Sequence, residues 1–89
     1  MPEEYEELVE KGKRKFEMAV KYAEGCDLVV PLYFMREAIM AFEEARRKAP
    51  VGVIFDVTRE GADSFEKTVE KINNIFIEKC GCRLKPWKR

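Results

Sequence analysis

Leu28-Val-Val-Pro-Leu-Tyr-Phe-Met-Arg-Glu-Ala-Ile-Met-Ala-Phe-Glu-Glu-Ala-Arg-Arg-Lys48 is the stretch that decides the fold. Its large apolar residues recur at intervals of four, three, four and three positions, the spacing of one face of an α-helix: Leu28, Leu32, Met35, Ile39 and Phe42. Ala38 and Ala45 lie beside this stripe, Asp27 precedes it as a candidate N-cap, and Pro50 follows it as a stop. We therefore predict a central helix over residues 28–48, with the stripe facing the core.

Two flanking segments carry helical patterns that can pack against this stripe. The first spans residues 2–24, with a predicted inward face of Tyr5, Leu8, Gly12, Phe16, Ala19, Val20 and Ala23. Glycine inside a helix costs about 1 kcal/mol relative to alanine, so we expect a close helix crossing at Gly12. The second spans residues 63–80, capped by Asp63 or Ser64 and ended by Gly81. Its predicted inward face comprises Phe65, Val69, Ile72, Ile75 and Phe76.

The segment from Pro50 to Gly61 leaves the fold class open. With helical spacing, one face holds Val51, Ile54, Phe55 and Thr58; with alternating spacing, one face of a strand holds Val51, Val53, Phe55 and Val57. A strand needs a partner, and the other candidates are residues 28–34, which Pro31 interrupts, and the short tail at 82–87. We predict an all-α bundle of three or four helices built from helical hairpins. The alternative is an α/β fold with strands near 28–34 and 51–57, or a strand that pairs across a homodimer.

Composition indicates one small domain over residues 1–89, with a basic tail at 82–89. Its 89 residues carry 17 acidic and 17 basic side chains, so the formal net charge is zero and does not by itself indicate a partner of either charge. His and Gln are absent while Glu, Lys and Arg are abundant, a composition typical of heat-adapted proteins. The longest uncharged apolar run has eight residues against the roughly 20 of a spanning helix, and the N-terminal glutamates are unlike a signal peptide. We expect a cytoplasmic protein without membrane association.

Residue types that support catalysis are scarce. No His can act as a base for a Ser or Cys nucleophile, and the only serine, Ser64, is a candidate helix cap. Gly12-Lys13 lacks the other residues of a phosphate-binding loop. We predict no enzymatic activity and no cofactor.

Three cysteines, Cys26, Cys80 and Cys82, allow three interpretations. A structural metal site would need a fourth ligand such as Asp27, which makes a metal centre the weaker hypothesis. A disulfide from Cys26 to either Cys80 or Cys82 is the second, and three thiols near helix ends are the third. The topology separates them, because a simple up-down-up bundle brings Cys80 to the Cys26 end, whereas an extra crossing helix over residues 50–60 carries it away.

The C-terminal tail has the composition of a nucleic-acid contact. Its candidate contact residues are Arg83, Lys85, Trp87, Lys88 and Arg89, because the cations can meet phosphates while Trp87 stacks on a base. Alternatively, Leu84 and Trp87 fold back onto the core. A nucleic-acid-binding accessory protein that uses this tail together with Arg46-Arg47-Lys48 is our second functional hypothesis.

Residues 36–50 resemble the second helix of a tetratricopeptide repeat, in which small residues, an aromatic residue and a closing proline fall where Ala38, Phe42, Ala45 and Pro50 stand. The resemblance implies a helical hairpin with a binding role. Isolated repeats of this kind need neighbours to bury their faces, which implies self-association. Tyr33, Phe34 and Met40 lie off the main stripe, where they cover a fourth helix or mark a dimer surface. Our main prediction is a non-enzymatic domain that binds a protein partner, or itself as a homodimer, through an apolar groove.

Overall fold

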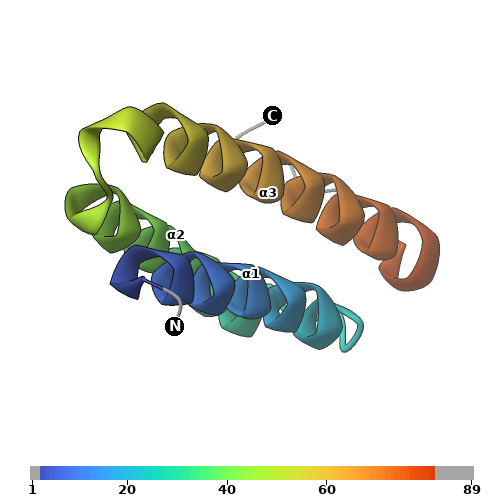
Figure 1. The fold of residues 1–89 in the computed structure, drawn as a ribbon. Coiled ribbons are helices and arrows are strands. Elements are labelled where there is room, and N and C mark those ends of the chain that lie inside the picture. Colours follow the sequence, from blue (N-terminus) through green and yellow to red (C-terminus); the bar gives the residue numbers. More distant parts are fainter. Residues whose placement is uncertain (1–2, 82–89) are drawn as a thin grey trace.

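The structure is a computed structural model, and it describes residues 3–81. It contains three long helices, α1 (Glu4–Ala23), α2 (Val29–Lys48) and α3 (Ile54–Ile75). A 3-10 turn, η1 (Val51–Val53), precedes α3, and a π-helical turn, η2 (Phe76–Cys80), follows it. Consecutive helices run antiparallel, and α3 lies along the hairpin of α1 and α2 (Figure 1). The all-α prediction is confirmed, and the alternative with strands near 28–34 and 51–57 is wrong, because both segments are helical.

Local hydrogen bonds account for the starts of the first two helices. The Glu3 backbone N–H donates to the Glu6 carboxylate at 3.0 Å as part of a capping box at the start of α1. The Val29 backbone N–H donates to Asp27 Oδ1 at 3.0 Å, so Asp27 serves the start of α2 from one position before the N-cap, Leu28. Pro31 lies in the first turn of α2, where an N–H has no partner within the helix, and the helix therefore tolerates it.

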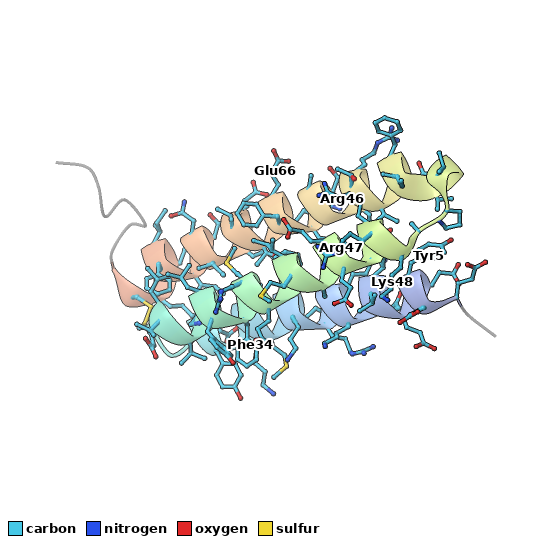
Figure 2. The ribbon with its side chains drawn as sticks, turned by 90° about the vertical axis from the view of Figure 1, so that its left-hand side faces the viewer. Tyr5, Phe34, Arg46, Arg47, Lys48 and Glu66 are labelled. Atoms are coloured by element: carbon cyan, nitrogen blue, oxygen red, sulfur yellow. A yellow bond between two sulfur atoms is a disulfide. The ribbon has the colours of Figure 1, made fainter. Side chains whose placement is uncertain are left out.

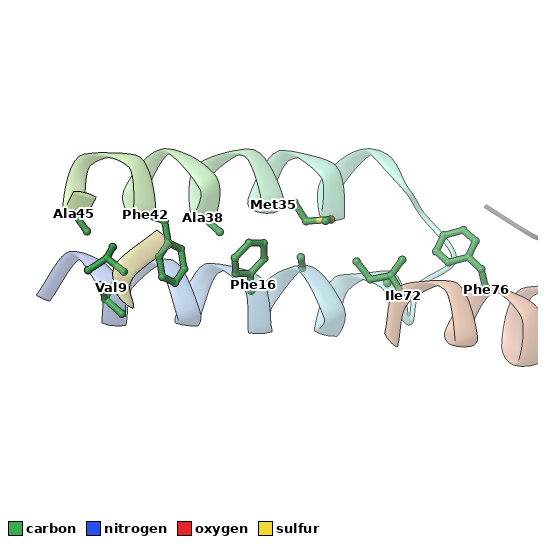
Figure 3. Close-up of a cluster of buried hydrophobic side chains, with 11 residues drawn as sticks. Val9, Phe16, Met35, Ala38, Phe42, Ala45, Ile72 and Phe76 are labelled. Atoms are coloured by element: carbon green, nitrogen blue, oxygen red, sulfur yellow. The ribbon is translucent and has the colours of Figure 1, made fainter. Parts of the chain in front are cut away.

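The core lies between the α1–α2 hairpin and α3 (Figure 3). It comprises Val9, Phe16, Ala19, Ala23, Met35, Ala38, Phe42, Ala45, Val57, Ile72 and Phe76. Gly12 is buried where α1 crosses α2: a Cβ atom there would lie 2.6 Å from Phe42 Cδ2 and 3.3 Å from the Ala38 carbonyl oxygen. The predicted close crossing at Gly12 is confirmed, and the small residues of both helices explain why α1 and α2 pack most closely together.

The inward face of α2 differs from the predicted stripe. Met35 and Phe42 are buried as expected, but Leu32 is 53% exposed and Ile39 is 39% exposed. The buried side instead carries Pro31, Met35, Ala38, Ala41, Phe42 and Ala45. Because small residues let two helix axes approach, the alanine side of α2 turns toward α1 and the larger branched side chains move to the flank.

The third helix begins about a turn after Pro50, not at Asp63 or Ser64, so the predicted caps there are wrong. Gly61 lies inside α3, whereas Gly81 ends η2 with φ 72°, as predicted. The inward face at the start of the third helix also differs from the predicted one: Val57 is buried, while Val51 and Phe55 are 85% and 82% exposed. Further along, Ile72 and Phe76 are buried and Ile75 is partly buried, as expected, but Phe65 and Val69 are exposed.

Candidate functional site

Four apolar side chains are exposed along the line where α2 and α3 meet. They are Leu32 (53% exposed) and Ile39 (39%) on α2, and Phe65 (39%) and Val69 (38%) on α3. Leu32 lies two helical turns before Ile39, and Val69 lies one turn after Phe65, so each pair lies on one face of its helix. Because the two helices are antiparallel, both pairs extend toward the same end of the bundle. We call these four residues the seam face.

A shallow groove of about 260 Å³ opens on the seam face between Ile39 and Phe65. It is lined by Phe16, Ile39, Phe42, Glu43, Arg46, Val57, Thr58, Gly61, Ala62 and Phe65. Gly61 holds it open, since a Cβ atom at that position would lie 3.1 Å from the Phe42 ring. The walls are mainly apolar and the charges of Glu43 and Arg46 come from α2, an arrangement that can receive an apolar side chain and surround it with polar groups.

Another exposed apolar surface lies on the side of the α1–α2 hairpin. It comprises Met18, Tyr22, Val29, Tyr33 and Met40, each at least 36% exposed, and we call it the hairpin face. Its rings already have partners: Tyr22 stacks on Phe34 with ring centroids 5.3 Å apart, Tyr33 meets Phe34 edge-on at 5.9 Å, and Lys15 Nζ lies 5.4 Å from the Phe34 centroid. No fourth helix within residues 3–81 covers Tyr33, Phe34 and Met40.

A groove of about 770 Å³ lies between the first halves of α1 and α3, and its walls are mostly charged. Lys13 forms an ion pair with Glu60 across it, and the side-chain hydrogen bond to Glu60 raises the pKa of Lys13 above its ordinary value. Partial desolvation, together with the nearby carboxylates of Glu6, Glu3 and Asp56, raises the pKa of Tyr5. These interactions fasten α1 to α3, and we assign this groove a structural role.

The three consecutive cations at the end of α2 do not form one patch. Arg46 lines the seam groove, Arg47 faces the opposite flank beside α1, and Lys48 Nζ lies 3.4 Å from Glu4 Oε2. Figure 2 shows the three side chains spread from the α3 side of the bundle to the α1 side. The predicted contact residues Arg83, Lys85, Trp87, Lys88 and Arg89 lie outside the described residues. The nucleic-acid hypothesis therefore stays a prediction that depends on the tail.

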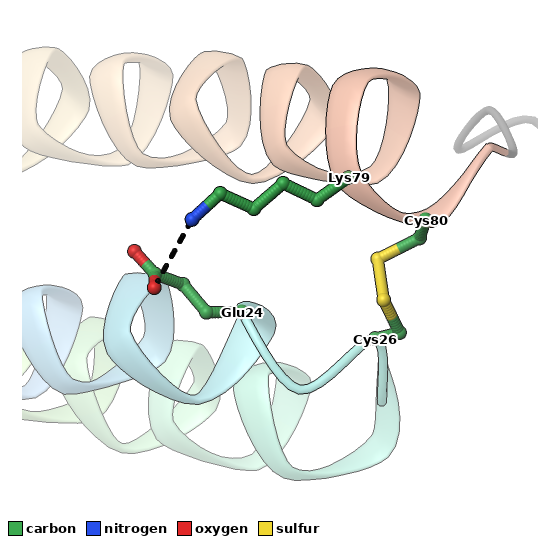
Figure 4. Close-up of a disulfide and its surroundings, with 4 residues drawn as sticks. All are labelled: Glu24, Cys26, Lys79 and Cys80. Carbon is green, nitrogen blue, oxygen red and sulfur yellow. Dashed lines mark hydrogen bonds and ion pairs between the residues drawn. A yellow bond between two sulfur atoms is a disulfide. The ribbon is translucent and has the colours of Figure 1, made fainter.

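Cys26 and Cys80 meet at the end of the bundle where α1 turns into α2 (Figure 4). A disulfide joins Cys26 to Cys80, with their Cα atoms 5.6 Å apart, and Lys79 Nζ lies 3.3 Å from Glu24 Oε1 beside it (Figure 4). Residues 50–60 enter the single helix α3 instead of forming an extra crossing, so the chain returns to the Cys26 end. Cys82 lies outside the described residues.

No three His, Cys, Asp or Glu side chains within residues 3–81 are placed to hold a metal ion together. Over the same residues, none of the helices combines the length and the apolar character needed to cross a bilayer. The described side chains thus provide apolar surfaces and charged grooves.

The seam face is composed of residues that the sequence pattern assigns to the core. The available signal is the apolar arc on α2 that Leu32, Met35, Ala38 and Ile39 share. Such an arc does not identify the neighbours that cover it.

Comparisons with known proteins provide no relative for this chain: no protein-family model, no curated protein and no solved structure matches it.

Proposed function

We propose that this protein is a helical interaction module that self-associates through its seam face. The observation that carries the proposal is the exposure of four apolar side chains on two adjacent helices, two of which, Ile39 and Phe65, line an apolar groove. Scattered exposed apolar residues are ordinary, whereas residues gathered on adjoining helix faces are typical of surfaces that bind protein. A second copy presents the same apolar side chains, so the seam faces of the two copies can cover each other.

Charge supports a second copy as the occupant of the seam face. A two-fold contact places the same surface on both sides, so it needs groups of both signs near each other. Glu43 and Arg46 both line the groove, and neither forms an ion pair within residues 3–81. The formal net charge of zero leaves little repulsion between copies.

The shape of the bundle also provides enough area. Its principal extents are 44 × 25 × 16 Å, so it is a flat molecule with broad faces. Each partner in an interface of standard size buries roughly 800 Å². The outline of the 44 × 25 Å face exceeds that area, so the size of the bundle permits an interface of standard size.

Sedimentation velocity and light scattering on the full chain, from low micromolar to millimolar concentration, test the proposal. We expect a reversible monomer–dimer equilibrium. In the dimer, the exposed part of the Ile39 side chain becomes buried in each copy, and Ile39→Asp removes this apolar burial. A loss of roughly 1.4 kcal/mol of binding free energy over both copies raises the dimer Kd about tenfold.

Met40→Asp is the matched control, because Met40 follows Ile39 in the same helix but belongs to the hairpin face. Its dimer Kd is expected to stay within about twofold of the unaltered chain, which is within ±0.5 kcal/mol. A chain that is monomeric at every concentration contradicts self-association. If Met40→Asp weakens the dimer as much as Ile39→Asp, the seam face is the wrong surface.

The cytoplasmic location and the heat-adapted origin remain predictions from composition. The likeness of residues 36–50 to a tetratricopeptide helix remains a proposal of the same kind, although the side chains that carry it, Ala38, Phe42 and Ala45, are buried at the α1–α2 contact.

A further inference from the structure

The third helix carries a second apolar stripe on its exposed side. Five exposed residues recur at intervals of three, four, three and four positions within α3: Phe55, Thr58, Ala62, Phe65 and Val69. This is the spacing of the a and d positions of a heptad, so the five side chains lie along one narrow face of the helix. We call these five residues the outer stripe.

The outer stripe is separate from the face that α3 turns toward its own core. That face carries Val57, Thr68 and Ile72, and the outer stripe lies roughly a quarter turn away around the helix axis. The polar group on the stripe is already paired, because the Thr58 hydroxyl donates to the Ile54 carbonyl at 2.9 Å. A neighbouring helix can therefore cover the stripe without leaving that hydroxyl proton unpaired.

The outer stripe continues the seam face toward the start of α3. Phe65 and Val69 belong to both surfaces, and Thr58 and Ala62 line the seam groove together with Ile39 of α2. The stripe extends about 21 Å in helical rise, from residue 55 to residue 69. Heptad stripes pack by inserting their side chains between those of another helix, so a helix is the shape of partner that fits this surface.

Two opposite charges border the outer stripe. Arg59 and Glu66 each follow a d position, so both occupy e positions of the heptad. Neither lines the seam groove, which places them on the flank of the stripe away from α2. Both are exposed, and neither forms an ion pair within residues 3–81. Charges at such flanking positions set which partner helix binds and in which orientation.

The order of residues along the outer stripe matches an antiparallel copy of itself. Ala62 lies midway between Phe55 and Val69, so a two-fold axis at Ala62 places Phe55 of one copy against Val69 of the other. The same axis places Phe65 against Thr58, a large side chain against a smaller one. Ala62 meets its own equivalent on the axis, where a small side chain lets the two helices approach closely.

The charges favour the same orientation. Arg59 precedes Ala62 by three positions and Glu66 follows it by four, so the antiparallel pair brings Arg59 of each copy to Glu66 of the other. In a parallel pair, e positions face g positions, which are here Gly61 and Thr68. Gly61 packs on Phe42 and Thr68 is buried, so a parallel pair leaves both charges without partners.

We propose that the outer stripe binds the α3 helix of a second copy, packed antiparallel as a two-fold coiled-coil pair centred on Ala62. This inference rests on the proposed self-association through the seam face. It names the helix that forms the centre of that contact and the two charges, Arg59 and Glu66, that fix its direction. Leu32 and Ile39 of α2 then contact the side of the second copy's α3.

Charge reversal on the full chain tests the orientation by sedimentation velocity at low salt. Arg59→Glu changes two contacts per dimer from attraction to repulsion, and we expect the dimer Kd to rise about tenfold. The double variant Arg59→Glu/Glu66→Arg restores opposite charges in reversed order, so its Kd should return to within about threefold of the unaltered chain. At about 1 M salt the effect of the single variant should largely disappear.

Lys67→Glu is the matched control. It makes the same change of charge on α3, but Lys67 lines a groove against α1 on the other side of the helix. Its Kd should stay within about twofold of the unaltered chain. Phe55→Asp probes the stripe independently, because Phe55 lies beyond the seam face, and it should raise the Kd about tenfold. Circular dichroism establishes that each variant keeps its helical content.

The outcomes separate this inference from the proposed function. If Ile39→Asp weakens the dimer while Arg59→Glu and Phe55→Asp do not, pairing through α3 is wrong and self-association through the seam face stands. If Arg59→Glu weakens the dimer and the double variant does not recover, the antiparallel orientation is wrong. A chain that is monomeric at every concentration overturns both proposals.

Discussion

The Phe42 ring is held between two glycines, and substitution of one of them measures how closely the helices pack. Gly12 of α1 and Gly61 of α3 face the ring from different helices. A Cβ atom on Gly12 would lie 2.6 and 2.7 Å from two ring carbons, against the roughly 3.5–4.0 Å of an ordinary carbon contact. On its other side the ring meets Gly61, where a Cβ atom would lie 3.1 Å away, so the ring cannot move aside freely.

Gly12→Ala therefore combines two opposing effects. Alanine in a helix interior is about 1 kcal/mol more favourable than glycine. Overpacking a well-filled core costs typically about 1–3 kcal/mol. The 3.3 Å approach to the Ala38 carbonyl oxygen adds a backbone contact that a change of side-chain rotamer cannot relieve, so the upper half of that range applies. We expect a net loss of about 1 kcal/mol in the free energy of unfolding.

Urea unfolding followed by circular dichroism measures this change. A loss of about 1 kcal/mol lowers the urea midpoint by roughly 0.3–1 M for a small protein. Gly52→Ala is the control, because a Cβ atom at Gly52 meets nothing within 4 Å, and it should raise stability by about 0.4–1 kcal/mol. In a Phe42→Leu background the penalty at Gly12 should shrink or reverse. If Gly12→Ala stabilises the chain as much as Gly52→Ala does, the close α1–α2 crossing is wrong.

Three further predictions concern alkaline pH, the disulfide and the tail. The raised pKa values of Lys13 and Tyr5 mean that the folded state holds both protons more tightly than the unfolded state. Their contributions to folding stability are therefore complete at neutral pH and disappear as the pH rises above about 10. The urea midpoint should fall over this pH range, and it should fall less in Lys13→Met and Tyr5→Phe. Cys26→Ser opens a loop with a sequence separation of 54, which costs about 4 kcal/mol by chain entropy, and should markedly lower the thermal midpoint; an unchanged midpoint would show that the disulfide contributes nothing. If the tail contacts nucleic acid, binding of a labelled single strand should weaken steeply with salt and disappear when residues 83–89 are removed, whereas no binding at low salt eliminates that hypothesis.

The periodic pattern determines the type and approximate extent of the first two helices. The four-and-three spacing over 28–48 and the apolar face over 2–24 favour a helix over a strand. The cost of Gly12 inside a helix correctly indicates a close crossing, because nothing else compensates for it. Gly81 likewise predicts its own left-handed turn.

The helical state of residues 51–61 depends on tertiary contacts, because the β-branched side chains of this segment by themselves favour a strand. Local propensities differ by only about 1 kcal/mol per residue, and burial of Val57 together with the contact of Gly61 with Phe42 outweighs them.

The direction in which α2 faces was also decided by packing. Leu32 and Ile39 are more hydrophobic than Ala38 and Ala45, yet the alanines are fully buried. The sequence by itself determined that three amphipathic segments form helices and that α2 carries a continuous apolar stripe. Only the tertiary structure decided which part of that stripe remains uncovered, because helix axes come closest where side chains are smallest, and the larger apolar groups are left at the seam between α2 and α3.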